Sequence, residues 1–188
     1  MAVLPIRTAP DSVLKQKAKK IHIVDRSIKK LIRDMLETMH AEPGRVGLAA
    51  PQVGVPLRVI VIGLPKEERE EARTKGGGGG GGGGSGGGGG ETAADIVLIN
   101  PEIVRRRGER VIAEGCLSVP GYFGEIKRAE AVIVKGRDQN GKEVRLKAEG
   151  LLAQALEHEI DHLNGTLYID HPEVKETLRK VQPEETGL

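Results

Sequence analysis

The chain has a single cysteine, Cys116, and no tryptophan among its 188 residues. One cysteine cannot form an internal disulfide bond, which excludes the class of small domains stapled by disulfides and fits a reducing compartment. A lone cysteine most often packs as a small apolar side chain, and its thiol is otherwise free to bind a metal. Aromatic residues are also scarce, with two tyrosines and one phenylalanine. The core must therefore be built from aliphatic side chains.

Charge of one sign and long apolar runs are also missing. The formal net charge is +2, and no run approaches the roughly 18 apolar residues needed to span a bilayer. Residues 1–20 lack the apolar stretch of a secretion signal. The basic run 105–107 is interpreted as the solvated end of a strand. We therefore expect a cytoplasmic protein with no direct nucleic-acid or membrane binding.

Residues 76–90 are glycine except for Ser85. Such a segment cannot build a core and loses much conformational entropy when ordered, which predicts a flexible loop, natural or engineered. Loop length penalises closure only weakly, so segments 59–64 and 96–99 on either side are expected to be neighbouring strands. We therefore expect a single domain over residues 1–188, with the glycine-rich loop at 76–90.

Apolar spacing predicts two helices among several strands. Asp25 is suited to cap a helix that ends before Pro43 and Gly44. A second, more apolar helix is expected between Gly150 and Asn164. Strands are expected at 59–62, 96–99 and 111–113, with a hairpin formed by 131–137 and 142–148. Helices and strands do not alternate regularly. The sequence thus predicts an α+β fold, with antiparallel or mixed sheets around a central helix and an N-terminal helix.

The central helix carries the sequence His-Glu-Ile-Asp-His at 158–162. Histidines four positions apart lie about 40° apart around a helix, so His158 and His162 are able to bind one metal ion. Glu159 points about 100° away, where it would reach a metal-bound water. The alternative is a solvated face with ordinary salt bridges. The apolar surroundings favour the metal, because each unpaired buried imidazole costs roughly 1–3 kcal/mol.

A third ligand is needed to complete such a site. In one class of zinc proteases it is a histidine shortly after the motif, but here that position is Tyr168. The only later histidine, His171, lies in an Asp-His-Pro turn. Upstream, Cys116 offers a thiolate, which binds zinc or ferrous iron strongly and leaves one coordination position open. A zinc endopeptidase nevertheless remains an alternative at this point.

Three segments follow one another along the chain: Gly47-Leu48-Ala49-Ala50-Pro51-Gln52, Glu114-Gly115-Cys116-Leu117-Ser118 and His158-Glu159-Ile160-Asp161-His162. In this order they resemble the peptide deformylase family. The resemblance spans nearly the whole chain apart from the glycine run and the last dozen or so residues, and it implies an enzyme of protein biosynthesis that removes the N-formyl group from the N-terminal methionine of nascent polypeptides.

The family resemblance also implies roles for individual residues. Cys116, His158 and His162 would hold one divalent ion, Fe²⁺ in this family, with Zn²⁺, Ni²⁺ or Co²⁺ able to substitute. Glu159 would act as general base and then acid. The remaining implied roles are oxyanion stabilisation by Gln52 and the Leu117 N–H, binding of the substrate backbone by Gly47, and a side-chain pocket lined by Val46, Leu151 and Ala155.

Two positions depart from the family pattern. Arg45 replaces a glycine, and we expect it either to contact a substrate carboxylate or to point outward. Phe123 replaces a substrate-contacting arginine, so that role is not carried over. The short, weakly basic segment 171–188 argues against a long ribosome-docking helix, leaving transient ribosome association open. A catalytically silent relative is the remaining alternative, opposed by the intact Glu159 and Gln52.

Overall fold

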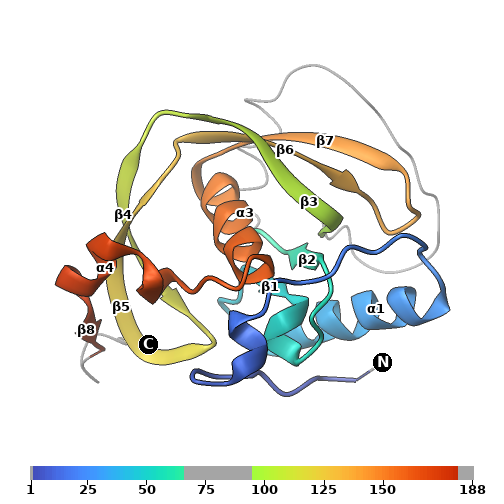
Figure 1. Cartoon of the computed structure of the whole chain (residues 1–188), viewed down its shortest axis with the longest axis horizontal. Coiled ribbons are helices and arrows are strands. Elements are labelled where there is room, and N and C mark those ends of the chain that lie inside the picture. Colours follow the sequence, from blue (N-terminus) through green and yellow to red (C-terminus); the bar gives the residue numbers. More distant parts are fainter. Residues whose placement is uncertain (1, 66–94, 182–188) are drawn as a thin grey trace.

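The computed structural model describes residues 2–65 and 95–181, and the predicted glycine-rich loop at 76–90 lies outside them. Within this part of the chain, two antiparallel sheets surround one central helix (Figure 1). The predicted α+β fold is thus confirmed. Among the described residues, none of the helices is long and apolar enough to cross a membrane.

The larger sheet has five strands in the order β1-β2-β3-β6-β7, and the smaller has three in the order β4-β5-β8. Neighbours β2 and β3 pair antiparallel, as expected for the segments that flank the glycine run. The predicted hairpin is formed by β6 and β7. The strands are β1 (Gly47–Ala49), β2 (Val59–Ile62), β3 (Ile96–Arg107), β4 (Arg110–Cys116), β5 (Val119–Arg128), β6 (Ala131–Arg137), β7 (Glu143–Glu149) and β8 (Arg179–Lys180).

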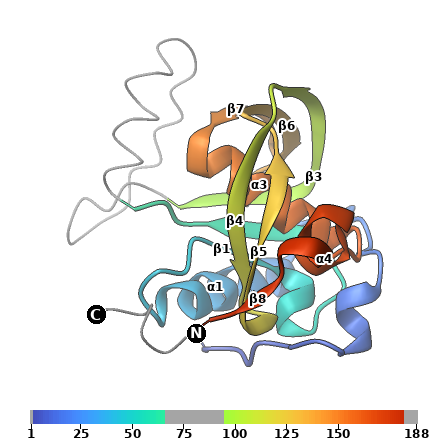
Figure 2. The same ribbon diagram turned by 90° about the vertical axis from the view of Figure 1, so that its left-hand side faces the viewer.

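Both predicted helices are present. The Asp25 side chain caps α1 (Arg26–His40) by accepting from the N–H groups of Ser27 and Ile28. The central helix is α3 (Gly150–Leu163). Sequence periodicity missed the short α4 (Pro172–Thr177), which packs beside β5 (Figure 2). It also missed the 3-10 helices at Ser12–Lys15, Ala50–Val53 and Tyr168–Asp170.

Strand β2 is buried on both faces because helices cover both. Its residues Ile60 and Ile62 belong to the core cluster that contains Leu156 of α3. The alternate residues Val59 and Val61 belong to the cluster formed with α1. A strand covered on both sides is expected to be a continuous apolar run, and β2 reads Val-Ile-Val-Ile. The sheet therefore separates α1 from α3.

The C-terminus of α3 is held by a buried arginine from the loop before β2. The guanidinium of Arg58 donates to the carbonyl oxygens of Leu163 (3.1 Å) and Pro101 (3.0 Å). It also donates to the side chain of Asn164 at 3.0 Å. A cation at this end of a helix pairs the last carbonyls and opposes the negative end of the helix dipole.

Replacing Arg58 with methionine is expected to lower the free energy of unfolding by about 2–4 kcal/mol, because buried carbonyls lose a charged donor. Urea denaturation measures this loss. The exposed Arg105 of β3 provides a control, since Arg105→Met should change stability by less than about 0.5 kcal/mol. Equal stability of the two variants would show that Arg58 does not secure the helix end.

Candidate metal centre

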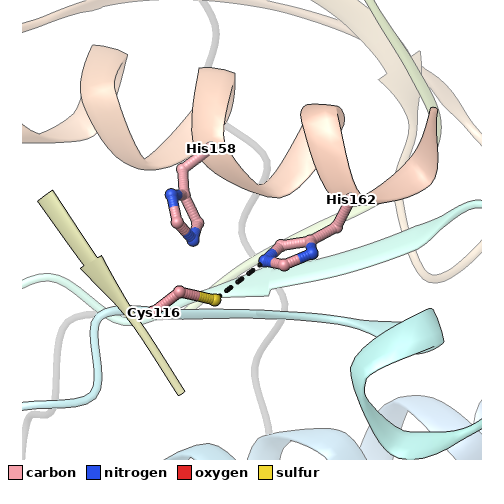
Figure 3. A group of neighbouring side chains, drawn as sticks. All are labelled: Cys116, His158 and His162. Atoms are coloured by element: carbon pink, nitrogen blue, oxygen red, sulfur yellow. Dashed lines mark hydrogen bonds between the residues drawn. The ribbon is translucent and has the colours of Figure 1, made fainter. Parts of the chain in front are cut away.

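Three potential ligands converge between α3 and the end of β4. His158 and His162 lie one turn apart on α3, and Cys116 is the last residue of β4. Ligand atoms of all three lie within 4.8 Å of one another. The Cys116 Sγ lies 3.2 Å from His162 Nε2, and both imidazoles point toward the sulfur (Figure 3). The structure thus brings together the Cys/His/His set that the sequence proposed.

The orientation of His158 is fixed by Glu114 of β4. The His158 Nδ1 lies 2.7 Å from Glu114 Oε2. Burial by itself would raise the pKa of Glu114, but hydrogen bonds with His158 and Arg128 outweigh it and lower this pKa to about 2. Glu114 is therefore an anion, and the Nδ1–H of His158 donates to it. This leaves Nε2 as the nitrogen directed at the site.

Arg128, the last residue of β5, ties this carboxylate to α3. Its guanidinium donates two hydrogen bonds to Glu114, at 2.9 and 2.8 Å, and one to Asp161 at 2.7 Å. His171 contacts the same Asp161 oxygen at 3.1 Å, so it is engaged away from the candidate ligands. Sequence reasoning missed Arg128, because a lone arginine at a strand end gives no pattern to detect.

The chemistry of the three side chains fits a divalent transition metal. A thiolate with two imidazoles suits zinc or ferrous iron and leaves room for a further ligand. Burial lowers the pKa of His162 well below its usual range, which keeps the imidazole in the neutral form that metals require. His162 Nδ1 is buried without a hydrogen-bond partner among the described residues.

The field at His158 favours a cation. Burial by itself would lower the pKa of His158, yet contacts with Cys116 and Glu114 raise it well above its usual range. Surroundings that favour a proton on this ring also favour a metal ion beside it. The charges around His158 and the types of side chain at the site therefore both favour a bound metal ion.

Glu159 lies beside the ligands and is only 4% exposed. Burial raises its pKa to about 7, against the opposing effect of His158. Its Oε2 has no hydrogen-bond partner among the described residues. A Cβ at Gly47 would lie 2.6 Å from Glu159 Oε1, so only glycine permits this close approach. A carboxyl group that titrates near neutrality is suited to accept a proton and return it.

The Gln52 amide is held with its NH₂ group toward the cysteine. Its Oε1 accepts from the Ala49 N–H at 2.8 Å, which fixes which end of the amide faces the site. Its Nε2 then lies 3.6 Å from Cys116 Sγ and 3.3 Å from Ser118 Oγ. Gln52 is 1% exposed. An amide donor is therefore aimed at the place where substrate would meet the metal.

A pocket of about 500 Å³ opens beside these groups. Its wall contains the three residues that the sequence assigned to a side-chain pocket, Val46, Leu151 and Ala155. Gly47 and Leu117 lie in the same wall. Tyr122 and Phe123, which the sequence did not assign to the pocket, also line it and are about 40% exposed.

Of the two expectations for Arg45, the one that it points outward was wrong. The residue lines the pocket, but its side chain is only 11% exposed and its guanidinium donates to the Thr38 carbonyl oxygen at 2.7 Å. It also pairs with Glu42 at 2.8 Å. The C-terminus of α1 attracts this cation, as helix C-termini do in general. Contact with a substrate carboxylate stays a prediction.

The site combines an interior helix that carries two imidazole ligands, a thiol ligand, a titratable carboxyl and an adjoining apolar pocket. This is the arrangement of a metal-dependent hydrolase.

Comparisons with known proteins agree with this class. Residues 3–178 match the family described as Polypeptide deformylase. The peptide deformylase of Dehalococcoides mccartyi (strain CBDB1) is 46% identical over 98% of this chain and 95% of its own length. That of Thermodesulfovibrio yellowstonii is 46% identical over 96% of each.

Solved structures give the same result. The peptide deformylase of Ehrlichia chaffeensis in complex with actinonin has a TM-score of 0.76 and 41% identity, covering 94% of this chain and 92% of that one. The enzyme from Thermotoga maritima has a TM-score of 0.73 and 33% identity, covering 97% of this chain and 100% of that one. The chain belongs to the peptide deformylase family.

Proposed function

We propose that the protein is a metal-dependent amide hydrolase that removes the N-formyl group from the N-terminal methionine of nascent polypeptides and releases formate. The observation that carries this proposal is the Cys116, His158 and His162 cluster beside Glu159, at the wall of an apolar pocket. Family membership supports the same reaction.

We propose Cys116, His158 and His162 as the ligands of one divalent ion, Fe²⁺, with Zn²⁺, Ni²⁺ or Co²⁺ as substitutes. A divalent ion lowers the pKa of water and so supplies hydroxide near neutral pH. The soft thiolate is the reason for naming these metals, because oxygen-preferring ions such as Mg²⁺ bind sulfur poorly.

Glu159 is proposed as the proton-transfer group. It accepts a proton from the attacking water and passes it to the amine of the methionine as the C–N bond of the formamide breaks. Formate and a free N-terminus result. The pKa of about 7 that burial gives this carboxyl suits both directions of transfer.

Negative charge collects on the formyl oxygen during attack. We assign its stabilisation to the Gln52 Nε2 and the backbone N–H of Leu117, which lie next to Cys116. Preformed donors aimed at such an oxygen are among the largest contributions to catalysis. The hydrogen bond from Ala49 holds the Gln52 amide in this orientation before substrate arrives.

The substrate chain is proposed to lie along β1. This strand is at the edge of the five-stranded sheet, and an extended peptide adds to such an edge through backbone hydrogen bonds. Gly47 would make these bonds, since the absence of a side chain keeps the approach to Glu159 open. Val46, Leu151 and Ala155 would then enclose the methionine side chain.

Replacing Gln52 with alanine is expected to lower kcat for a formyl-methionyl peptide by roughly a hundredfold, because one oxyanion donor is lost. Steady-state kinetics with a formate-detecting assay measure this. Gln139 lies in the exposed turn between β6 and β7, and Gln139→Ala is the control, with unchanged kcat. An equal kcat for wild type and Gln52→Ala would remove Gln52 from the reaction.

The deciding experiment is formate release from a formyl-methionyl peptide by anaerobically prepared, metal-loaded protein. Internal peptide fragments instead of formate would favour an endopeptidase. Tyr168 argues against that alternative, because it stands where one class of zinc proteases has its third histidine ligand. Its side chain is 1% exposed and its hydroxyl donates to the Tyr122 carbonyl oxygen at 2.9 Å. Bound metal without turnover would identify a silent relative.

We further propose that residues 1–188 form one catalytic domain in the cytoplasm, with the glycine-rich loop at 76–90 outside the chemistry. Nascent chains emerge from ribosomes, so transient ribosome association belongs to this proposal. Release of formate from ribosome-bound nascent chains, compared with free peptides of the same sequence, tests that association.

A further inference from the structure

Residues 45–47 form one wall of the pocket, and we call them the pocket edge. They follow an exposed turn at 41–44 that contains Pro43 and Gly44, the latter with φ of +84°. The exposed turn has little packing to hold the pocket edge in place. Backbone pairing with β2 holds Val46 and Gly47 from one side, and a side-chain contact at Arg45 can hold the edge further near Glu159, where a Cβ at Gly47 would collide.

We propose that Arg45 is a positioning residue that fixes the pocket edge against the C-terminus of α1. Its side chain is 11% exposed and reaches back to the Thr38 carbonyl oxygen at 2.7 Å. Thr38 is itself fully buried, and its hydroxyl donates to the Asp34 carbonyl oxygen and accepts from the Leu4 N–H. The anchor point of Arg45 is therefore rigid.

The end of α1 provides a natural site for this cation. The C-cap residue, Ala41, has helical backbone angles (φ −63°, ψ −24°), so no left-handed glycine closes the helix there. The last carbonyls of a helix then need other donors, and a cation is favoured by the helix dipole. Glu42 adds an ion pair at 2.8 Å, but it is 67% exposed, and exposed pairs contribute little.

The consequence concerns substrate binding rather than chemistry. Immediately after Arg45, the Val46 carbonyl oxygen accepts from the Gly63 N–H at 2.9 Å, and Gly47 pairs with Ile62. The proposed ligands and Glu159 lie on β4 and α3 instead. Loss of the anchor therefore loosens the edge that receives the peptide and leaves the proposed ligands and Glu159 in place. This inference rests on the proposed function for its kinetic part.

The test compares metal-loaded wild type with Arg45→Met. We expect KM for a formyl-methionyl peptide to rise about tenfold with kcat within about twofold, because a hydrogen bond from a charged group is lost and binding weakens uniformly. The KM of Arg45→Lys should lie between those of wild type and Arg45→Met, because an ammonium keeps the charge but lacks the planar set of N–H donors of a guanidinium. Glu42→Gln should leave KM nearly unchanged.

A second measurement does not depend on activity. Amide hydrogen exchange at Gly63 reports on its bond to the pocket edge, and we expect Arg45→Met to exchange faster there by about tenfold. Arg33→Met removes an exposed arginine from the same helix and should change neither exchange nor KM.

Each outcome decides the proposal. Unchanged exchange with raised KM would mean that Arg45 contacts substrate directly, and faster exchange with unchanged KM would mean that the anchor does not serve binding. Loss of kcat at constant KM would place Arg45 in the chemistry. All three results overturn the proposal. If wild type releases no formate, the proposed function fails, and exchange at Gly63 alone decides whether Arg45 fixes the edge.

Discussion

Glu159→Ala is expected to lower kcat for formate release by about 10²–10⁴-fold, the range lost when a positioned general base is removed. KM should change less, because Glu159 is assigned to proton transfer and not to holding the peptide. Metal content should stay the same, since none of the three proposed ligands is altered. Anaerobic kinetics and metal analysis of the same samples measure these effects together.

Stability provides an independent check on Glu159. The carboxyl is buried, has one oxygen without a hydrogen-bond partner in the described part of the chain, and has a raised pKa, all of which are unfavourable in the folded state. Glu159→Ala should therefore unfold at the same or a higher urea concentration than wild type. Glu176→Gln, at an exposed acid of α4, should alter neither activity nor stability. Full activity in Glu159→Ala would eliminate the proposed mechanism.

Cys116→Ala is expected to abolish stable metal binding and, with it, formate release. Two imidazoles alone hold a divalent ion far more weakly than a set that includes a thiolate. After gel filtration, the metal content should fall from nearly one ion per chain in wild type to nearly none in Cys116→Ala. Cys116→Ser should bind weakly, because a hydroxyl replaces the thiol in the same place.

Thermal unfolding tests the same ligand without any substrate. An ion that binds only the folded state raises the melting temperature, and the stabilisation grows with the logarithm of its concentration once this exceeds Kd. Added Zn²⁺ should therefore stabilise metal-free wild type and leave Cys116→Ala unchanged. A normal zinc-dependent shift in the alanine variant would remove Cys116 from the site.

Sequence reasoning succeeded where the signal is local. The stripe of α3 and the turn between β6 and β7 are each encoded within a few neighbouring residues, and both elements were found within a residue or two. β5 was missed because Pro120, Gly121 and Gly124 interrupt its pattern. β8 has only two residues, and pairing with β5 defines it.

The same distinction applies to the site. His158 and His162 are one helical turn apart, so spacing alone suggested a metal. Cys116 lies far away in sequence, and only the fold, or resemblance to a family, brings it to them. Arg128 and Arg45 act on partners that spacing cannot reveal, namely the carboxylate of Glu114 and a helix-end carbonyl.

The bonds from Arg128 to Glu114 and Asp161 lock β4, β5 and α3 together around the ligands. Because the fold already holds both ligand-bearing elements, β4 and α3, in place, little ordering entropy is lost when an ion enters, unlike a zinc finger, which folds around its metal. The metal-free protein is then a stable receptor rather than an unfolded chain. One ion is therefore expected to exchange for another without unfolding, so that the metal supply around the protein, more than the fold, decides which ion it carries.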